Sequence, residues 1–176
     1  FEEAEAVSRE TWQGRQRLLG DDSRDTLASL ALYAQTLADQ RKLPEAERLT
    51  RQCLKTCERV LGSDDYDTIV VLGNLAYVLA DRGDLVQAER CAREEVTRFR
   101  RAGLADRDEA LYAVNNLALF RFVQGRPEEA ETLLVEARPR AARVFGAEHI
   151  ITLHLQHVLA RVLAEEGKLD EAETLA

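Results

Sequence analysis

Two cysteines, Cys53 and Cys57, lie four residues apart. On a helix this spacing puts both thiols on one face, where they could form half of a metal site. No histidine or second cysteine pair has a matching spacing, and a buried free cysteine packs like a small apolar side chain. We therefore interpret the pair as core residues and expect no metal ion. With Cys91 the chain has three cysteines, an odd number without disulfide-framework spacing that favours free thiols in a reducing cytosol.

Three histidines, His149, His154 and His157, cluster late in the chain. The last two share a face of a predicted helix, and imidazoles there could bind zinc or act as a general base. No further ligand and no paired carboxylate accompanies them, and both roles need such a partner. The histidines are therefore interpreted as a polar wall of a groove.

A row of carboxylates recurs every 42 residues, at Glu47, Glu89, Glu131 and Glu173. A catalytic pair needs carboxylates with perturbed pKa values in a pocket. A regular row indicates instead a solvated face or a fixed hydrogen bond to a neighbouring turn. The sequence also has no phosphate-binding glycine loop, nucleophile elbow or HExxH motif. We expect neither enzymatic activity nor a cofactor.

The same 42-residue step runs through the whole chain without an insertion or deletion. Periods of this length are the signature of a tandem repeat array. A set of residues spaced by 42 is called a column here. Some columns hold alanine, some hold larger apolar residues and one holds glycine: Ala34, Ala76, Ala118 and Ala160; Ala46, Ala88, Ala130 and Ala172; Leu27, Ile69, Leu111 and Leu153; Gly83, Gly125 and Gly167.

Each repeat is predicted to be a hairpin of two helices. Apolar residues in the segment 68–81 follow the 3.6-residue period of an amphipathic helix. Asp25 and Asp67 stand where an N-cap is expected. Gly83 should end the first helix, because glycine adopts the left-handed conformation at little cost, and the second helix should begin near Leu85. In all we expect seven nearly full helices and a short eighth.

The repeats divide the chain into a second-helix remnant at 1–20, hairpins at 24–61, 66–103 and 108–145, and a truncated unit at 150–176. Because the chain begins in mid-pattern, we expect it to be a piece of a longer protein. The two ends, with Phe1 and Val7 at one and Leu169, Ala172 and Leu175 at the other, lack polar capping elements. Uncapped repeat arrays tend to associate, so weak self-association through the ends is expected.

The columns resemble a known family. Leu75-Ala76, Leu79, Gly83 and Ala88 are similar to the tetratricopeptide repeat signature. The 42-residue length, the string Asn115-Asn116-Leu117-Ala118 and the linkers at 59–62 and 143–146 resemble its kinesin-light-chain-type variant. HEAT and armadillo repeats have similar lengths, ~40–47 residues, but fit the paired alanine columns and the glycine less well. The resemblance covers essentially the whole chain and implies an all-α, right-handed superhelical solenoid of antiparallel helix hairpins.

The resemblance also implies that first helices line a concave groove. By register, nine residues are candidates for this peptide groove: Asn74, Tyr77, Tyr112, Asn115, Asn116, Phe122, His154, His157 and Arg161. An asparagine amide donates and accepts hydrogen bonds at once, which suits a peptide backbone, and exposed rings suit anchor sites. Members that clamp a carboxyl terminus use several cations here, whereas this groove has only Arg161.

Charge and composition limit the classes of partner that this chain is expected to bind. The net charge is −8 and the pI about 5.0, which disfavours nucleic acid. No apolar run is long enough to suggest a membrane span. The sequence thus predicts a cytoplasmic protein-interaction scaffold that binds a peptide or helix of a partner protein. The alternative is a structural or regulatory segment of a larger signalling enzyme, a kinase or an NTPase, whose catalytic domain lies outside this chain.

Overall fold

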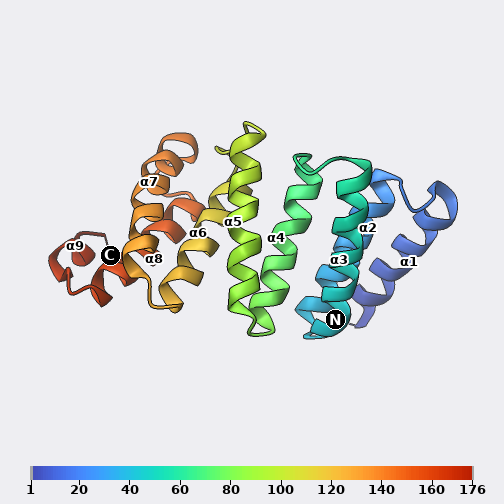
Figure 1. The fold of residues 1–176 in the computed structure, drawn as a ribbon, viewed down its shortest axis with the longest axis horizontal. Coiled ribbons are helices and arrows are strands. Elements are labelled where there is room, and N and C mark those ends of the chain that lie inside the picture. Colours follow the sequence, from blue (N-terminus) through green and yellow to red (C-terminus); the bar gives the residue numbers. More distant parts are fainter. Residues whose placement is uncertain (1, 176) are drawn as a thin grey trace. The chain divides into compact units, whose positions relative to one another are not determined.

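The computed structural model describes residues 2–175, with side chains from residue 3, and every regular element in this range is a helix. Phe1, whose expected position at an open end was part of the prediction, lies outside the described residues, as does Ala176. The helices, shown in Figure 1, are α1 (Glu2–Leu19), α2 (Arg24–Asp39), α3 (Leu43–Val60), α4 (Tyr66–Asp81), α5 (Leu85–Arg101), α6 (Asp108–Val123), α7 (Pro127–Phe145), α8 (Ile150–Glu165) and α9 (Leu169–Leu175). The predicted all-α class is confirmed.

The helix count in the prediction was too low by one. Within residues 2–175 the structure has eight long helices and a seven-residue ninth. The prediction counted one leading helix and six from the three hairpins, and it left out α8 as a further full-length helix. The chain divides into two compact units, up to Cys91 and from Ala92, and the two are described separately below.

In the first unit, α1 packs against α2, α2 against α3 and α3 against α4. Its core contains leucines from α2 and α3 together with the buried cysteines Cys53 and Cys57. Trp12 of α1 stacks on Tyr33 of α2, with the ring centroids 5.7 Å apart. Trp12 therefore packs against the following hairpin and connects α1 to the repeat that follows it.

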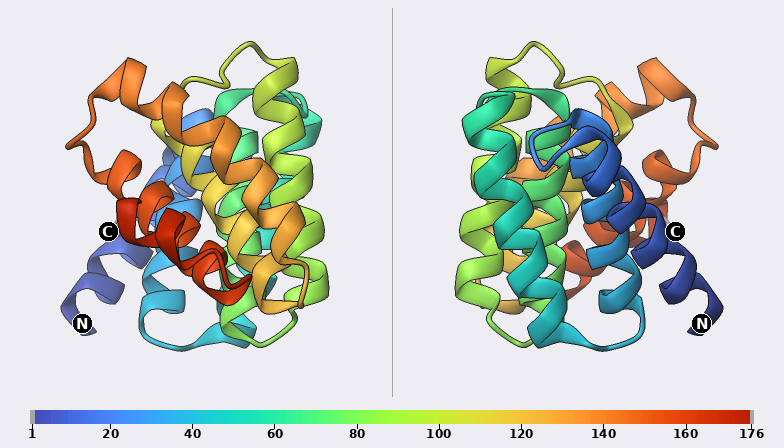
Figure 2. Two further views of the ribbon diagram at one scale, coloured as in Figure 1. Left: turned by 90° about the vertical axis from the view of Figure 1, so that its left-hand side faces the viewer. Right: turned by 90° about the vertical axis from the view of Figure 1, so that its right-hand side faces the viewer.

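In the second unit, α6 packs against α7, α7 against α8 and α8 against the short α9 (Figure 2). The fully buried side chains here include Leu111 of α6, Leu134 of α7 and Leu155 of α8. Helix α7 begins at Pro127, the first-turn position where the missing N–H of proline costs nothing. Helices α6 and α8 also touch directly, which brings two successive first helices together.

The turn inside each hairpin has the predicted geometry. Gly83 has φ 86°, and the N–H groups of Gly83 and Asp84 donate to the carbonyls of Ala80 and Leu79, both at 2.9 Å. These bonds satisfy the last carbonyls of α4 and let the chain reverse. In the first repeat the same position is Arg41, a non-glycine residue with φ 63°. A side chain at this φ is strained, so this turn is the least favourable of the set.

The predicted N-caps were wrong by two residues. The N-cap of α4 is Asp65, whose carboxylate accepts the Asp67 N–H at 3.0 Å, and the N-cap of α2 is Ser23. Asp25 and Asp67 lie in the first turns instead. Helices α2 and α4 therefore begin at Arg24 and Tyr66. A carboxylate in the first turn is still favoured, because it faces the positive end of the helix dipole.

Small residues fill the tightest contacts. Ala46, Ala88 and Ala130 are fully buried at the start of the second helices, and Ala76 and Ala118 are buried in the first helices. Side chains of this size let paired helices approach closely. The apolar column at Leu27 has one exception, since Leu153 of α8 is 44% exposed.

Candidate functional site

The predicted groove residues come from three first helices. Asn74 and Tyr77 lie on α4 in the first unit, and the others lie on α6 and α8 in the second. The α6–α8 surface is defined here by Tyr112, Asn116, Phe122, His154, His157 and Arg161.

Two contacts join α6 to α8 across this surface. The Tyr112 and His154 rings meet edge to face with centroids 5.8 Å apart. The guanidinium carbon of Arg161 lies 5.7 Å from the centroid of the Phe122 ring. A cation over a ring at this distance is held by the ring quadrupole, by about 0.5–1 kcal/mol where the pair is exposed. Both pairs fix the orientation of side chains that would otherwise move freely, and a fixed surface loses less entropy on binding.

The adjacent asparagines of α6 have different surroundings. Asn116 is exposed, whereas Asn115 is buried and its Oδ1 accepts no hydrogen bond from the part of the chain that the structure describes. Successive residues on a helix point about 100° apart, so one side chain can face solvent while the next faces inward. Asn116 is thus the amide that a ligand can reach, while the unsatisfied carbonyl oxygen of Asn115 costs stability.

The first unit has its own exposed set. Asn74 is half-buried, Tyr77 is 44% exposed, and Leu32 of α2 is 60% exposed. Partial burial and the carboxylates of Asp81 and Asp39 raise the pKa of Tyr77. The phenol therefore stays protonated and can donate a hydrogen bond.

An apolar hollow between α1 and α2 was missed by the sequence reasoning. It has a volume of about 570 Å³ and is lined by Val7, Thr11, Leu32 and Thr36 among others. Val7 is more than half exposed. The i, i+4 spacing of Val7 and Thr11 put both on one face of the first helix, and this was the available signal. The prediction had instead assigned Val7 to the end of the array.

The recurrent carboxylates form ion pairs with the turn of the next repeat. Glu5 lies 42 residues before Glu47 and so extends the row toward the N-terminus. Lys42 donates to Glu5 at 2.5 Å, and Lys168 donates to Glu131 at 2.7 Å. Glu47 accepts from Arg51 at 2.8 Å and also pairs with Arg82 in the α4–α5 turn. Of the two interpretations left open, the fixed hydrogen bond to a neighbouring turn holds at these positions.

The cysteines and His149 have structural surroundings. Cys53 and Cys57 are buried, their sulfurs lie 3.9 Å apart, and the Cys53 thiol donates to the Leu27 carbonyl at 3.4 Å. The hydrogen bond with Cys57 and burial raise the pKa of Cys53, so it remains a thiol. His149 is the N-cap of α8, and its Nδ1 accepts the Ile151 N–H at 3.4 Å. It is therefore separate in role from the exposed His154 and His157.

Within residues 2–175 the structure contains no group of three or more histidine, cysteine or acidic side chains that could hold a metal ion. The same range contains no helix long and apolar enough to cross a membrane.

A family model for the tetratricopeptide repeat matches the sequence twice, at residues 31–101 and 108–176. The chain belongs to the tetratricopeptide repeat (TPR) family. The two matches together span most of the chain and agree with the predicted resemblance. Among curated protein sequences, none matches.

Solved structures share the TPR fold at low sequence identity. The nearly identical TPR-like repeats of a kinesin-light-chain-type protein of Podosopora anserina match with a TM-score of 0.84 and 22% identity, over 99% of this chain and 82% of that one. BtubC (BKLC) from P. vanneervenii matches with a TM-score of 0.87 and 19% identity, over 99% and 70%. PlcR of Bacillus thuringiensis, solved in complex with the peptide PapR7 and DNA, matches with a TM-score of 0.69 and 14% identity, over 98% and 63%. These matches show that the chain has the TPR fold.

Proposed function

We propose that this TPR chain is a protein-interaction scaffold that binds a peptide or helix of a partner protein on its first-helix surfaces. The observation that carries the proposal is Arg161. Its guanidinium is exposed over the Phe122 ring, and no carboxylate pairs with it in the part of the chain that the structure describes. Most other arginines of the repeats pair with a neighbouring acid, as Arg24, Arg51 and Arg59 do. An unpaired cation beside an aromatic ring suits an acidic side chain of a ligand.

The rest of the α6–α8 surface supplies complementary chemistry. Asn116 can donate to and accept from one peptide unit, which fixes the ligand backbone. The paired rings of Tyr112 and His154 offer rigid area for an apolar side chain. The ligand we propose is therefore a segment with an acidic residue near Arg161 and an apolar residue near Tyr112.

The half-buried Asn74 and the exposed Tyr77 and Leu32 of the first unit repeat this combination of an amide, a ring and an apolar side chain. We propose that they contact the same ligand or a second segment of the same partner. The net charge of −8 supports a protein ligand rather than a nucleic acid, and the proposed setting is the cytoplasm.

A peptide-display selection on the purified chain tests the proposal, with binding of the selected peptides then measured by calorimetry. Asn116→Ala and Arg161→Ala should each weaken binding by about 1–3 kcal/mol, and raised salt should weaken it further. Arg93→Ala is the matched control, because Arg93 is an exposed arginine on the second helix α5. If only the control weakens binding, the α6–α8 surface is not the site.

A structural or regulatory role within a larger signalling enzyme is the competing function. It predicts that no selected peptide depends on Asn116 or Arg161. Because the TPR fold is a scaffold type, any catalytic step of such an enzyme is assigned to another domain.

A further inference from the structure

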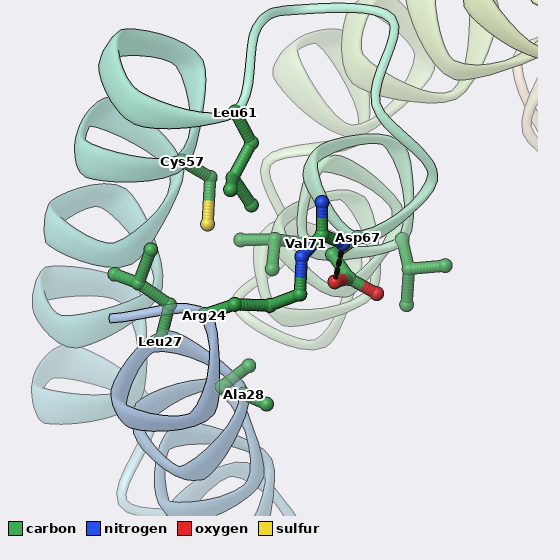
Figure 3. Close-up of a pocket in the computed structure, with 9 residues that line it drawn as sticks. Arg24, Leu27, Ala28, Cys57, Leu61, Asp67 and Val71 are labelled. Carbon is green, nitrogen blue, oxygen red and sulfur yellow. Dashed lines mark hydrogen bonds and ion pairs between the residues drawn. The ribbon is translucent and has the colours of Figure 1, made fainter. Parts of the chain in front are cut away.

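A cavity of about 170 Å³ lies between α2, α3 and α4 in the first unit. Its inner wall contains the buried Leu27, Cys57 and Val71, and the exposed Ala28 and Arg24 lie at its mouth. Figure 3 shows the Cys57 sulfur pointing into this space, with Leu61 beside it. Nearly all of the wall is apolar. Apolar cavities of about 150 Å³ stay dry and can hold a molecule as large as benzene.

The three complete repeats can be compared at two positions near the end of the second helix. The first complete repeat, which contains the cavity, has no aromatic ring at either position. Cys57 and Leu61 are one helical turn apart and hold these positions in the first complete repeat. In the next repeat the ring is Phe99, which is 1% exposed. In the third repeat the ring is Phe145, which stacks on the His149 ring with the two centroids 4.9 Å apart. Each of the other two complete repeats therefore has an aromatic ring at one of these two positions, whereas the first repeat has none.

The charged side chains at the mouth of the cavity form ion pairs with one another. Arg24 donates to Asp65 at 2.7 Å and 3.2 Å and also pairs with Asp67. An anionic ligand would have to compete with two carboxylates for Arg24, and a cationic ligand would have to displace Arg24 from them. Charged groups lose hydration on entering an apolar cavity and find no free partner here. The surroundings thus favour a neutral ligand.

We propose that this cavity is a binding site for a small neutral molecule with a single aromatic ring. By register the ring of the ligand corresponds to the side chains of Phe99 and Phe145, and it contacts the Cys57 thiol, Leu61 and Val71. It joins α2, α3 and α4 and so stabilises the first unit. This inference is independent of the proposed peptide ligand, because no residue of the α6–α8 surface takes part.

A titration of the whole chain with toluene tests the site. The methyl NMR signals of Ala28, Ala31 and Val71 report on binding. We expect saturable shifts of these signals and a rise in the thermal midpoint. Benzoate and benzylammonium, which present the same ring with a negative or positive charge, should bind at least tenfold more weakly.

Two variants copy the next repeat and fill the cavity. Cys57→Phe introduces the ring of Phe99, and Ala28→Val introduces the side chain of Val70. Each should weaken toluene binding at least tenfold. Ala164→Val is the matched control, since Ala164 is exposed on α8 and should leave binding unchanged.

Three outcomes would overturn the site: no saturable shift in the unsubstituted chain, equal binding by benzoate, or undiminished binding in a filling variant with the helical content of the parent. If Cys57→Phe does not fold, Ala28→Val alone decides the question.

Discussion

Glu95 is a carboxyl group inside the protein. It lies on α5 and is 6% exposed, and its equivalents in the neighbouring repeats are the small residues Cys53 and Ala137. Burial raises the pKa of Glu95 to about 8 from its ordinary value of 4.5. Desolvation is the only cause of this shift, so the neutral form is the one that the interior accepts.

The sign and size of the effect on stability follow from this pKa. Between pH 4.5 and about 8 the folded chain holds a proton on Glu95 that the unfolded chain has lost. The free energy of unfolding therefore falls as the pH rises through this window and becomes level above it. One pKa unit corresponds to about 1.4 kcal/mol, so this single group should lower stability by up to about 4 kcal/mol between pH 5 and pH 9.

Urea unfolding followed by circular dichroism between pH 5 and pH 9 measures this effect. The near-isosteric Glu95→Gln removes the titration, so the variant should gain stability over the parent as the pH rises. Glu136→Gln, an exposed change on α7, should follow the pH profile of the parent. Parallel profiles for the parent and Glu95→Gln would show that Glu95 is hydrated in solution and that the argument from burial is wrong.

Ala88→Leu should lower the free energy of unfolding by about 1–3 kcal/mol, because Ala88 is fully buried and the larger side chain overpacks the start of α5; an unchanged urea midpoint would contradict this. Arg41→Gly should raise stability by about 1 kcal/mol, since the turn at φ 63° then matches Gly83, and the exposed pair lost with Asp81 offsets little. Thermal unfolding of Arg41→Gly beside Arg41→Ala separates the backbone effect from the lost charge. Thiol counting on denatured protein without reductant should return three free thiols, as the structure has them, and a lower count would indicate a disulfide or a modification.

The 42-residue period was sufficient to predict the helix hairpins and the turns inside them, but not the number of full-length helices or their N-caps. Gly83 marked the end of α4 and Pro127 the start of α7, because both residues have strong conformational preferences. The N-cap was harder to place, since Asp65 and Asp67 are chemically the same residue and either could cap the helix. Only the backbone geometry of the turn decides between them.

The repeat register predicted which residues belong to the candidate site, but not which of their side chains touch. Register places Tyr112 and His154 on neighbouring first helices, yet it does not specify that their rings touch, because rotamers decide this. In the same way, register gave Asn115 and Asn116 equal standing, and the structure buries only the first. The cavity beside Cys57 could not be predicted from one column, since it arises from small side chains on three helices together.

The ion pairs between successive repeats bear on how such an array can change in length. Lys42 and Lys168 each lie 37 residues after the glutamate that they bind. Gain or loss of a complete 42-residue unit re-creates this spacing at the new junction, and a pair can form there when the residue at the lysine position is cationic, but not when it is an aspartate such as Asp84. A single inserted residue within a second helix would instead rotate the glutamate by about 100° and separate it from its lysine. These ion pairs are thus more sensitive to a change in repeat length than to a change in repeat number.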